Sequence, residues 1–342
     1  MKSTLSYDLT KRIEEKIRLI AVVLCEMKED DYSLMYGKTG IALFLFYYWR
    51  WKNQKLFHEK AKGLINSVFS ELNKKIYLYK KNRYEPDLSF DSGLGGIGWG
   101  LNHLIKMGFI DCDLQETMCL VDAAIYRKMI TGIHSDNGSS FKDALLISLY
   151  ASDREDRLSK EYLRRFIHEF TELTTQENNE IFKKYYKDNN EMIAFINNKI
   201  RKKYPDIITE GFDSMDHAIF DDTSILKRTD NLINEKAELS INVGSGLASG
   251  IILRGYHANK KFRETSQSTY QKTVERCFDL LLKQKNRITP EDALGFWFTD
   301  SRGLWKIHYG LKNGLAGIGM ALLNTITNDE STWDEFLVGC MG

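Results

Sequence analysis

Short segments that are apolar on almost every side recur along the chain, and each follows a pair of glycines. The pairs and the segments after them are Gly37 and Gly40 with IALFLFYYW, Gly93 and Gly96 with IGWGLNHLI, Gly246 and Gly250 with IILRGYH, and Gly314 and Gly317 with IGMALLN. A degraded copy starts at Gly138, where the second glycine is missing. Segments without a polar face are typical of buried helices. The pattern therefore predicts a repeated buried helix that is opened by a glycine turn.

A second kind of segment follows the buried ones, and its apolar residues recur every three or four positions. These one-sided stripes lie in residues 61–76, 114–125, 158–170 and 270–281. The spacing predicts amphipathic helices that bury one face. Residues 1–31 predict a further amphipathic helix at the start of the chain. Only three prolines interrupt the sequence, so long helices are permitted across most of it.

Alternation of buried and half-exposed helices predicts an all-α fold, and specifically an α/α toroid. In that fold an inner ring of helices, here opened by the glycine turns, lies inside an outer ring. We expect a single domain over residues 1–342. Residues 153–240 contain no glycine pair of the repeat, and we expect 174–240 to be an insertion or a lid within the domain.

The glycines of the repeat allow two interpretations. Glycine lacks a Cβ atom, so the turns could serve only to let backbones pack closely. Alternatively, the start of each inner helix leaves unpaired N–H groups and a partial positive charge, which could bind anions, thiolates or oxyanions in one cavity. On the second interpretation the candidate substrate-binding glycines are Gly37, Gly93, Gly96, Gly246, Gly314 and Gly317.

Neither of two apparent nucleotide motifs is supported. The GKT at residues 37–39 has Tyr32 where a phosphate-binding loop needs its first glycine. The stretch GLGGIGWG at residues 93–100 resembles a dinucleotide fingerprint, but no strand–helix–strand unit surrounds it. Both belong to the helical repeat.

Composition narrows the choice of partner and compartment. Basic and acidic residues number 48 and 47, for a net charge of +1, which gives no argument for nucleic acid. The longest apolar run near the N-terminus, Leu19 to Cys25, is too short to span a membrane. Five scattered cysteines, with no Cys-x-x-Cys pair, favour free thiols and hence a cytoplasmic protein.

The glycine copies resemble the lanthionine synthetase C-like (LanC-like) family. The segments that carry the resemblance are YGKTGIALFL at 36–45, SGLGGIGWGLNHLIKMGFI at 92–110 and YGLKNGLAGIGMALLN at 309–324, followed by STWDEFLVG. The resemblance implies an α/α toroid that acts on a ribosomally made peptide. Enzymes of the family hold zinc with two cysteines and a histidine, add a substrate thiolate to a dehydroalanine or dehydrobutyrine, and protonate the resulting enolate.

The sequence departs from that family at the zinc ligands. It contains neither a Trp-Cys nor a Cys-His pair, and Gly244-Ser245-Gly246 stands where Cys-His-Gly is expected. Cys277 falls on an apolar stripe, and Cys340 lies beyond the last copy. We therefore expect no cofactor, or zinc only at an unconventional site, and thiolate chemistry on zinc is in doubt.

Other side chains are weak candidates for catalysis. His308 lies just ahead of the last glycine turn and could act as a general acid or a lone metal ligand, or make a structural hydrogen bond. Asp300, Arg302 and Tyr309 lie near it in sequence, and Tyr309 could contact substrate. Asp91 precedes the second turn and could face the cavity or cap the helix.

A second group of polar residues could bind a metal. The acidic loop GFDSMDHAIFDDTSILKRTD supplies oxygen and nitrogen donors from Asp213, Asp216, His217, Asp221 and Asp222. Such loops are more often simply solvated.

Three functions are consistent with these observations. The first is a LanC-like protein that modifies a ribosomally made peptide. The second is a metal-free relative that binds a peptide or a partner modification enzyme. The third is a carbohydrate-active α/α toroid that uses Asp91 and Asp300 as paired acids, with Trp297 and Trp305 stacking on sugars.

Overall fold

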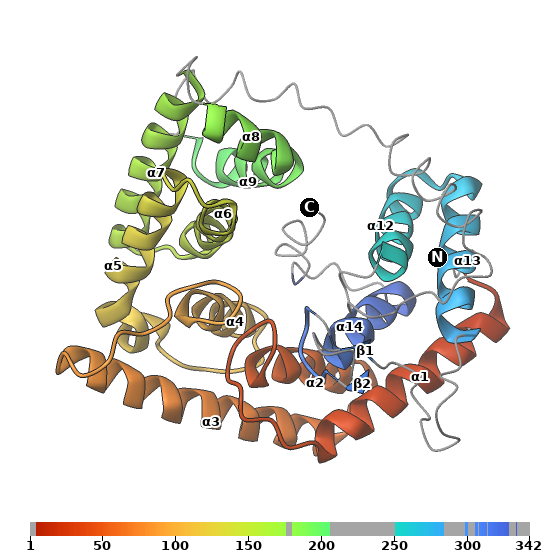
Figure 1. Ribbon diagram of the computed structural model, residues 1–342. Coiled ribbons are helices and arrows are strands. Elements are labelled where there is room, and N and C mark those ends of the chain that lie inside the picture. The colour runs from red at the N-terminus through yellow and green to blue at the C-terminus, as the bar shows by residue number, and fades with distance from the viewer. Residues whose placement is uncertain are drawn as a thin grey trace. The chain divides into compact units, whose positions relative to one another are not determined.

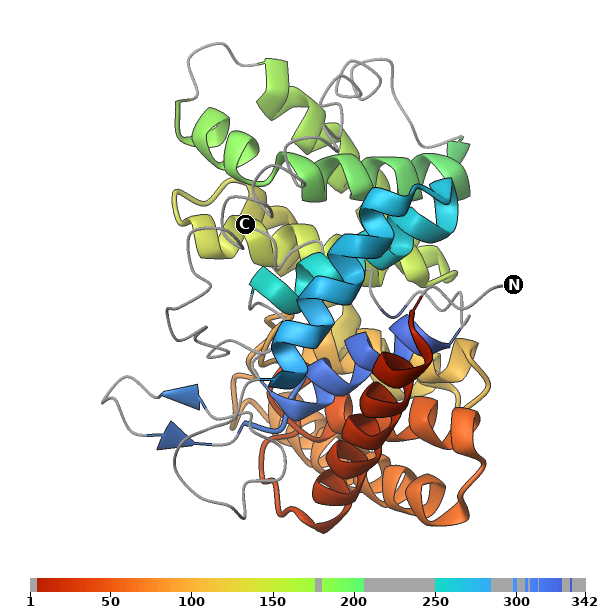
Figure 2. The same cartoon turned by 90° about the vertical axis from the view of Figure 1, so that its right-hand side faces the viewer.

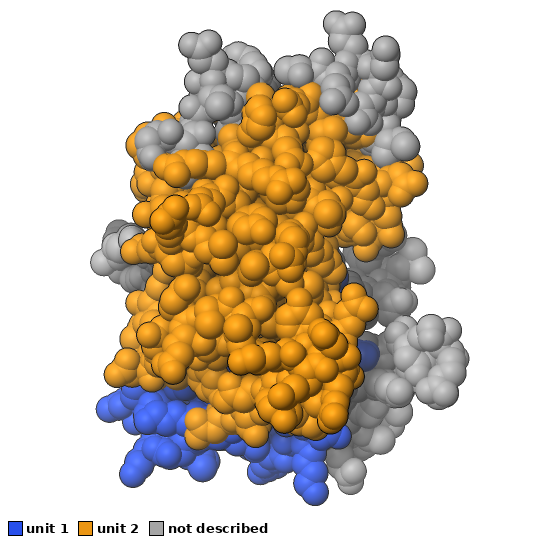
Figure 3. Space-filling model, turned by 90° about the vertical axis from the view of Figure 1, so that its left-hand side faces the viewer, with its two compact units in different colours: residues 1–31, 35–65, 221–331 blue, residues 32–34, 66–220, 332–342 orange. Residues whose placement is uncertain are grey.

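A computed structural model describes residues 5–175, 180–205, 250–283, 298–299, 305–306, 308–312, 314–327 and 333. The chain groups into two compact units, coloured separately in Figure 3. Unit 1 consists of residues 1–31, 35–65 and 221–331, and unit 2 of residues 32–34, 66–220 and 332–342. The single domain over residues 1–342 stays a prediction.

Unit 1 combines helices from both ends of the chain (Figure 1). Its elements are α1 (Tyr7–Glu26), α2 (Lys38–Lys52), the start of α3 (Lys55–Lys80), α12 (Gly250–Thr265), α13 (Ser268–Lys283), β1 (Phe298–Thr299), β2 (Trp305–Lys306) and α14 (Leu315–Ile326). The two strands pair antiparallel, Phe298 with Lys306 and Thr299 with Trp305. This short hairpin, visible in Figure 2, is an addition that the helical periodicity did not predict.

The described secondary structure of unit 2 consists of helices joined by loops. It contains the remainder of α3 and then α4 (Leu94–Lys106), α5 (Leu114–Ile133), α6 (Gly138–Asp153), α7 (Arg157–Thr175), α8 (Glu180–Asp188) and α9 (Asn190–Lys203). Helix α6 packs against α4, α5, α7 and α9, so it is the central helix of this unit. The predicted insertion includes α8 and α9, while residues 206–240 lie outside the described part.

Every described copy of the glycine repeat opens a helix, as predicted. Helices α2, α4 and α14 begin directly after Gly37, Gly93 and Gly314, α6 begins at Gly138, and α12 begins at Gly250. In α2 all ten residues from Thr39 to Tyr48 are buried. The predicted all-round burial of these helices is therefore confirmed for α2, and α4, α6 and α14 show the same long buried runs.

The predicted amphipathic helices are also confirmed. Helices α1, α3, α5, α7 and α13 cover the predicted stripes. In α13 the five stripe residues Tyr270, Val274, Cys277, Phe278 and Leu281 are all buried. The fold class is all-α, apart from the two-residue strands, and its pairing of buried with half-buried helices is that of an α/α toroid.

The first and last copies of the repeat pack against each other within unit 1. Helix α14 contacts both α1 and α2. A Cβ on Gly319 of α14 would lie 2.5 Å from the Phe44 ring of α2, so the glycine allows the two helices to approach closely. The N–H of Lys312 also donates to the carbonyl of Met35 at 2.9 Å. Helices that are distant in sequence, α1 and α2 on one side and α14 on the other, therefore pack together within unit 1.

Among the described residues, no helix has both the length and the apolar character needed to cross a membrane.

Candidate functional site

The glycine turns share one backbone geometry at three helix starts. In each, the first N–H of the helix donates to a carbonyl seven residues earlier: Lys38 to Asp31 at 2.8 Å, Leu94 to Asp87 at 2.8 Å and Leu315 to His308 at 2.9 Å. The loop before the helix therefore folds back over the helix end and caps it with main-chain oxygens.

The same loop also engages further N–H groups of α14 and α4. Ala316 donates to Tyr309 at 3.0 Å, Gly317 donates to Gly310 at 3.3 Å, and Gly96 donates to Ser89 at 3.4 Å. These amides are already satisfied, so the expectation of unpaired N–H groups at the inner helix starts is wrong for them. Anion binding at these turns would have to break a backbone bond or use side chains.

Close approach of the loop explains the glycines at these positions. A Cβ on Gly314 would lie 2.6 Å from the nitrogen of Gly310 and 2.7 Å from the carbonyl carbon of His308. A Cβ on Gly96 would collide with the carbonyl oxygen of Phe90. Backbone atoms cannot move aside as a flexible side chain can, which supports the packing interpretation. Substrate contact by Gly37, Gly93, Gly96, Gly314 and Gly317 stays a prediction, and Gly246 lies outside the described residues.

A carboxylate that the sequence reasoning missed shapes the turn of α4. Asp87 accepts hydrogen bonds from the Ser89 N–H at 2.8 Å, the Ser89 hydroxyl at 2.9 Å and the Ser92 hydroxyl at 2.7 Å. Burial acts to raise the pKa of Asp87, but these bonds and Lys128 outweigh it and hold the pKa below its ordinary value. The N-cap of α4 is Gly93 and not Asp91, so the capping role considered for Asp91 is wrong. Asp91 is half-buried in this loop.

In unit 1 the turns of α2 and α14 come together. Gly310 packs against the backbone of Met35 and Tyr36, and the ammonium of Lys312 lies 5.8 Å from the Tyr36 ring centre. His308 is exposed and Tyr309 is half-buried in the same turn. The structure thus brings His308 and Tyr309 to the start of α14, whereas Asp91 belongs to unit 2 and Asp300 lies outside the described residues.

The acidic loop with Asp213, Asp216, His217, Asp221 and Asp222 also lies outside them, as do Arg302, Trp297, Cys340 and residues 244–246. Trp305 is described only through its backbone pairing in β2.

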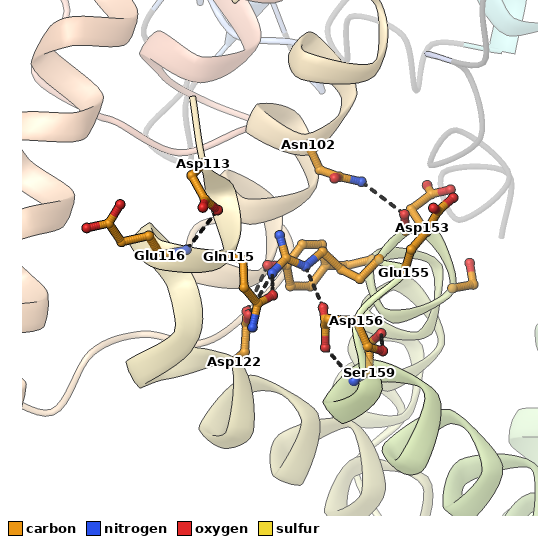
Figure 4. Close-up of polar contacts among 12 residues, drawn as sticks. Asn102, Asp113, Gln115, Glu116, Asp122, Asp153, Glu155, Asp156 and Ser159 are labelled. Carbon is orange, nitrogen blue, oxygen red and sulfur yellow. Dashed lines mark hydrogen bonds and ion pairs between the residues drawn. The ribbon is translucent and has the colours of Figure 1, made fainter. Parts of the chain in front are cut away.

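A buried cluster of charges at the end of α6 is the second feature that the sequence did not reveal (Figure 4). Arg154 reaches Asp122 of α5 at 3.2 Å, the Gln115 amide oxygen at 2.5 Å and Asp156 at 3.1 Å. The Tyr150 hydroxyl donates to the other oxygen of Asp122 at 2.8 Å. Burial raises the pKa of Asp122 to about 6, against the opposing effect of Arg154.

Asp153, the residue before Arg154, lies between two lysines, and its pKa is shifted in the opposite direction to that of Asp122. Its two oxygens bind Lys106 of α4 at 3.0 Å and Lys199 of α9 at 2.9 Å. Burial acts to raise the pKa of Asp153, but Lys199 and Lys106 outweigh it and hold the pKa below its ordinary value. In the sequence these residues form the charged run SDREDR, which resembles an ordinary solvated loop because the partners come from distant segments.

The described cysteines do not fit the family's zinc centre. Burial raises the pKa of the Cys25 thiol to about 11, and burial with the flanking acids Asp111 and Asp113 raises the pKa of Cys112. Cys277 is buried in α13, and the exposed Cys119 donates to the Glu116 carbonyl. Zinc binds thiolates, which the thiols of Cys25 and Cys112 do not readily form at neutral pH. Within the described ranges no three His, Cys, Asp or Glu side chains gather as metal ligands.

Comparison with known families agrees with the helical repeat. Residues 28–195 match the family model of the lanthionine synthetase C-like proteins. The matched segment includes the capped turns at Gly37 and Gly93 and the helices α2 to α7. The chain belongs to the lanthionine synthetase C-like family, and its fold class is the all-α class of an α/α toroid. None of the curated proteins compared with the chain matches it.

Proposed function

We propose that this protein acts in the modification of a ribosomally made peptide, as enzymes of its family do. The observation that carries the proposal is the match of residues 28–195 to the family, over a segment that contains two of the three capped turns. The proposed partner is the peptide itself or the enzyme that modifies it before ring closure. A cytoplasmic location belongs to the same proposal, supported by the five scattered cysteines.

If the protein closes thioether rings, a side chain must protonate the enolate that forms when the thiol adds. We assign that role first to His308, which is exposed at the start of α14. Imidazole is well suited to proton transfer near neutral pH. Tyr309 and the glycines of the same turn would contact the peptide. Asp91 and Asp300 remain secondary candidates.

One observation favours an alternative, a metal-free member of the family that binds a peptide or partner enzyme without ring closure. The thiols of Cys25 and Cys112 are held in their protonated form by their surroundings, and the chain has no Cys-His or Trp-Cys pair. Without thiolate ligands the family's usual means of activating a substrate thiol is missing. No observation of the described residues favours the carbohydrate-active alternative.

The test uses the full chain, purified without chelator, and a pool of synthetic linear peptides that each carry one dehydroalanine and one cysteine. Zinc content is measured by mass spectrometry of the metal. Binding is measured by enrichment of peptides on the immobilised protein. Ring closure is measured by the loss of thiols that react with N-ethylmaleimide. A matched pool with alanine in place of dehydroalanine is the control.

Stoichiometric zinc together with ring closure would establish the enzyme. Enrichment without zinc or ring closure would establish the binding member. If no peptide is enriched and no ring forms, the proposed function is wrong.

A further inference from the structure

Two adjacent residues at the end of α6 each hold two partners of opposite charge. Asp153 lies between Lys106 and Lys199, and Arg154 lies between Asp122 and Asp156. We call Asp153 with Lys106 and Lys199 the lysine triad. We call Arg154 with Asp122 and Asp156 the acid triad. The side chain of Asp122 is 1% exposed and that of Arg154 is 6% exposed, so this pair is almost free of water, whereas the side chain of Asp156 is 17% exposed.

The acid triad connects three helices of unit 2. Asp122 and Gln115 come from α5, Tyr150 and Arg154 end α6, and Asp156 precedes α7. Asp156 also accepts from the N–H of Ser159 at 2.9 Å, so it caps α7 while it holds Arg154. The triad therefore closes the junction between α6 and α7 onto α5.

The charges of the acid triad do not balance. Two carboxylates face one guanidinium, so the triad carries one excess negative charge when every group is ionised. The other titratable groups around Asp122 are Tyr150 of α6 and Tyr126 of α5, and burial raises the pKa of both, so both stay neutral. An uncompensated buried charge costs free energy, and the simplest way to remove it is to protonate one carboxylate.

We propose that the acid triad is a proton-linked lock, in which unit 2 takes up one proton at Asp122 under mildly acidic conditions and thereby closes the α5–α6–α7 junction more tightly. Protonation leaves one carboxylate with one guanidinium, a balanced pair. The Tyr150 hydroxyl still donates to Asp122, and Gln115 and Asp156 still hold Arg154.

The sign of the pH dependence follows because closing of the junction is linked to binding of a proton at Asp122. Burial raises the pKa of Asp122 from 3.8 to about 6, so between these values the folded junction binds a proton that the open junction does not. The stabilisation is fully present below the lower value and is lost as the pH rises through the upper one. These two values correspond to about a tenfold increase in the opening equilibrium between pH 5 and pH 7.

The lock is tested by hydrogen–deuterium exchange of the full chain at pH 5, 6, 7 and 8, corrected for intrinsic exchange rates. We expect protection of amides 145–160 to fall about tenfold from pH 5 to pH 7, while α2 in unit 1 shows no such slope. The variant Asp122→Asn, which mimics the protonated acid, should be as protected at pH 7 as the natural chain is at pH 5. Glu155→Gln is the matched control, because Glu155 is 77% exposed beside the same junction.

A flat or rising protection of residues 145–160 with pH in the natural chain would overturn the proposal, whatever the variants do. So would an unchanged slope in Asp122→Asn. If that variant does not fold, Asp156→Asn replaces it, because Asp156 contributes to the raised pKa of Asp122 and its removal should reduce the slope.

Discussion

Gly98 and Gly319 occupy the same place in two copies of the repeat, five residues after Gly93 and Gly314. Each lies against an aromatic ring from another buried helix. A Cβ on Gly98 would lie 2.9 Å from the Tyr150 ring and 3.0 Å from its hydroxyl, and one on Gly319 would lie 2.5 Å from the Phe44 ring. At the residue scale, this glycine of the motif therefore sets how closely buried helices pack.

This contact predicts that Gly98→Ala and Gly319→Ala destabilise the protein by about 1–3 kcal/mol each, the usual effect of overpacking a buried contact. Thermal unfolding measures the change. Gly63→Ala is the control, because Gly63 lies inside α3 with nothing within 4 Å of its added Cβ, and it should stabilise by about 0.5–1 kcal/mol. Equal shifts in all three variants would contradict the assignment.

A second prediction at this scale concerns His308. If the protein closes rings, His308→Ala should lower the closure rate by about 100-fold, a typical loss for a general acid, and leave peptide enrichment unchanged. Tyr7→Phe, at a residue 86% exposed on α1, should leave both unchanged. A His308 variant with a natural closure rate would remove this residue from the mechanism.

At the scale of elements, the buried helices differ in how their N-termini are capped. Helices α2, α4 and α14 use carbonyls of the preceding loop, whereas α6 has lost the second glycine and uses a side chain. The side-chain amide oxygen of Asn137 accepts from the Ser139 N–H at 2.9 Å. The degraded copy thus keeps its helix by a different cap.

Asn137→Ala should therefore destabilise the protein by about 1 kcal/mol, as the loss of an N-cap does. Asn137→Gly should cost only a few tenths of a kcal/mol, because glycine is tolerated at this position. Urea unfolding of both variants measures the difference. An Asn137→Ala variant with the natural stability would show that the side chain is not the cap.

The end of α14 depends on a residue from another helix. The guanidinium of Arg263 on α12 donates to the carbonyls of Asn324 at 2.5 Å, Thr325 at 3.3 Å and Thr327 at 2.5 Å. Arg263→Ala should cost about 1–3 kcal/mol, because these carbonyls lose a charged donor. Lys261→Ala, which removes a surface pair with Glu264, should cost less than about 1 kcal/mol. Thermal unfolding again distinguishes them.

At the scale of the whole molecule, two groups of carboxylates oppose each other in their response to pH. Hydrogen bonds and cations hold the pKa values of Asp87 and Asp153 below their ordinary range. Their stabilisation is present above the ordinary carboxyl pKa and is lost as the pH falls through the lowered one. Burial raises the pKa values of Asp122 and Asp143, so their contribution falls as the pH rises.

Together these carboxylates predict a maximum of stability near pH 5, with a steep loss below about pH 4. Melting temperatures from pH 3 to pH 8 at constant ionic strength measure the profile. Asp122→Asn should flatten the limb between pH 5 and pH 7 and leave the acid limb unchanged. A maximum above pH 7 would contradict this balance of groups.

Much of the fold could be predicted because its signals are local. Apolar residues at every third or fourth position predicted α5 and α13, and glycine pairs predicted the starts of α2, α4 and α14. The candidate site was harder to predict. The roles of Asp87 and the acid triad could not be predicted, because they depend on hydrogen-bond and ion-pair partners. Only folding brings those partners, such as Ser92 and Arg154, within reach of the carboxylates.

The sequence by itself determined which segments become helices and which of their faces are apolar, because backbone preference and amphipathic period are properties of neighbouring residues. Only the tertiary structure decided that loop carbonyls cap the starts of α2, α4 and α14, and that the first and last copies meet at Gly319 and Phe44. It also decided that the pKa of Asp122 is raised while that of Asp153 is lowered. The physical reason is that burial, hydrogen-bond geometry and local electrostatics depend on residues that are distant along the chain and adjacent only after folding.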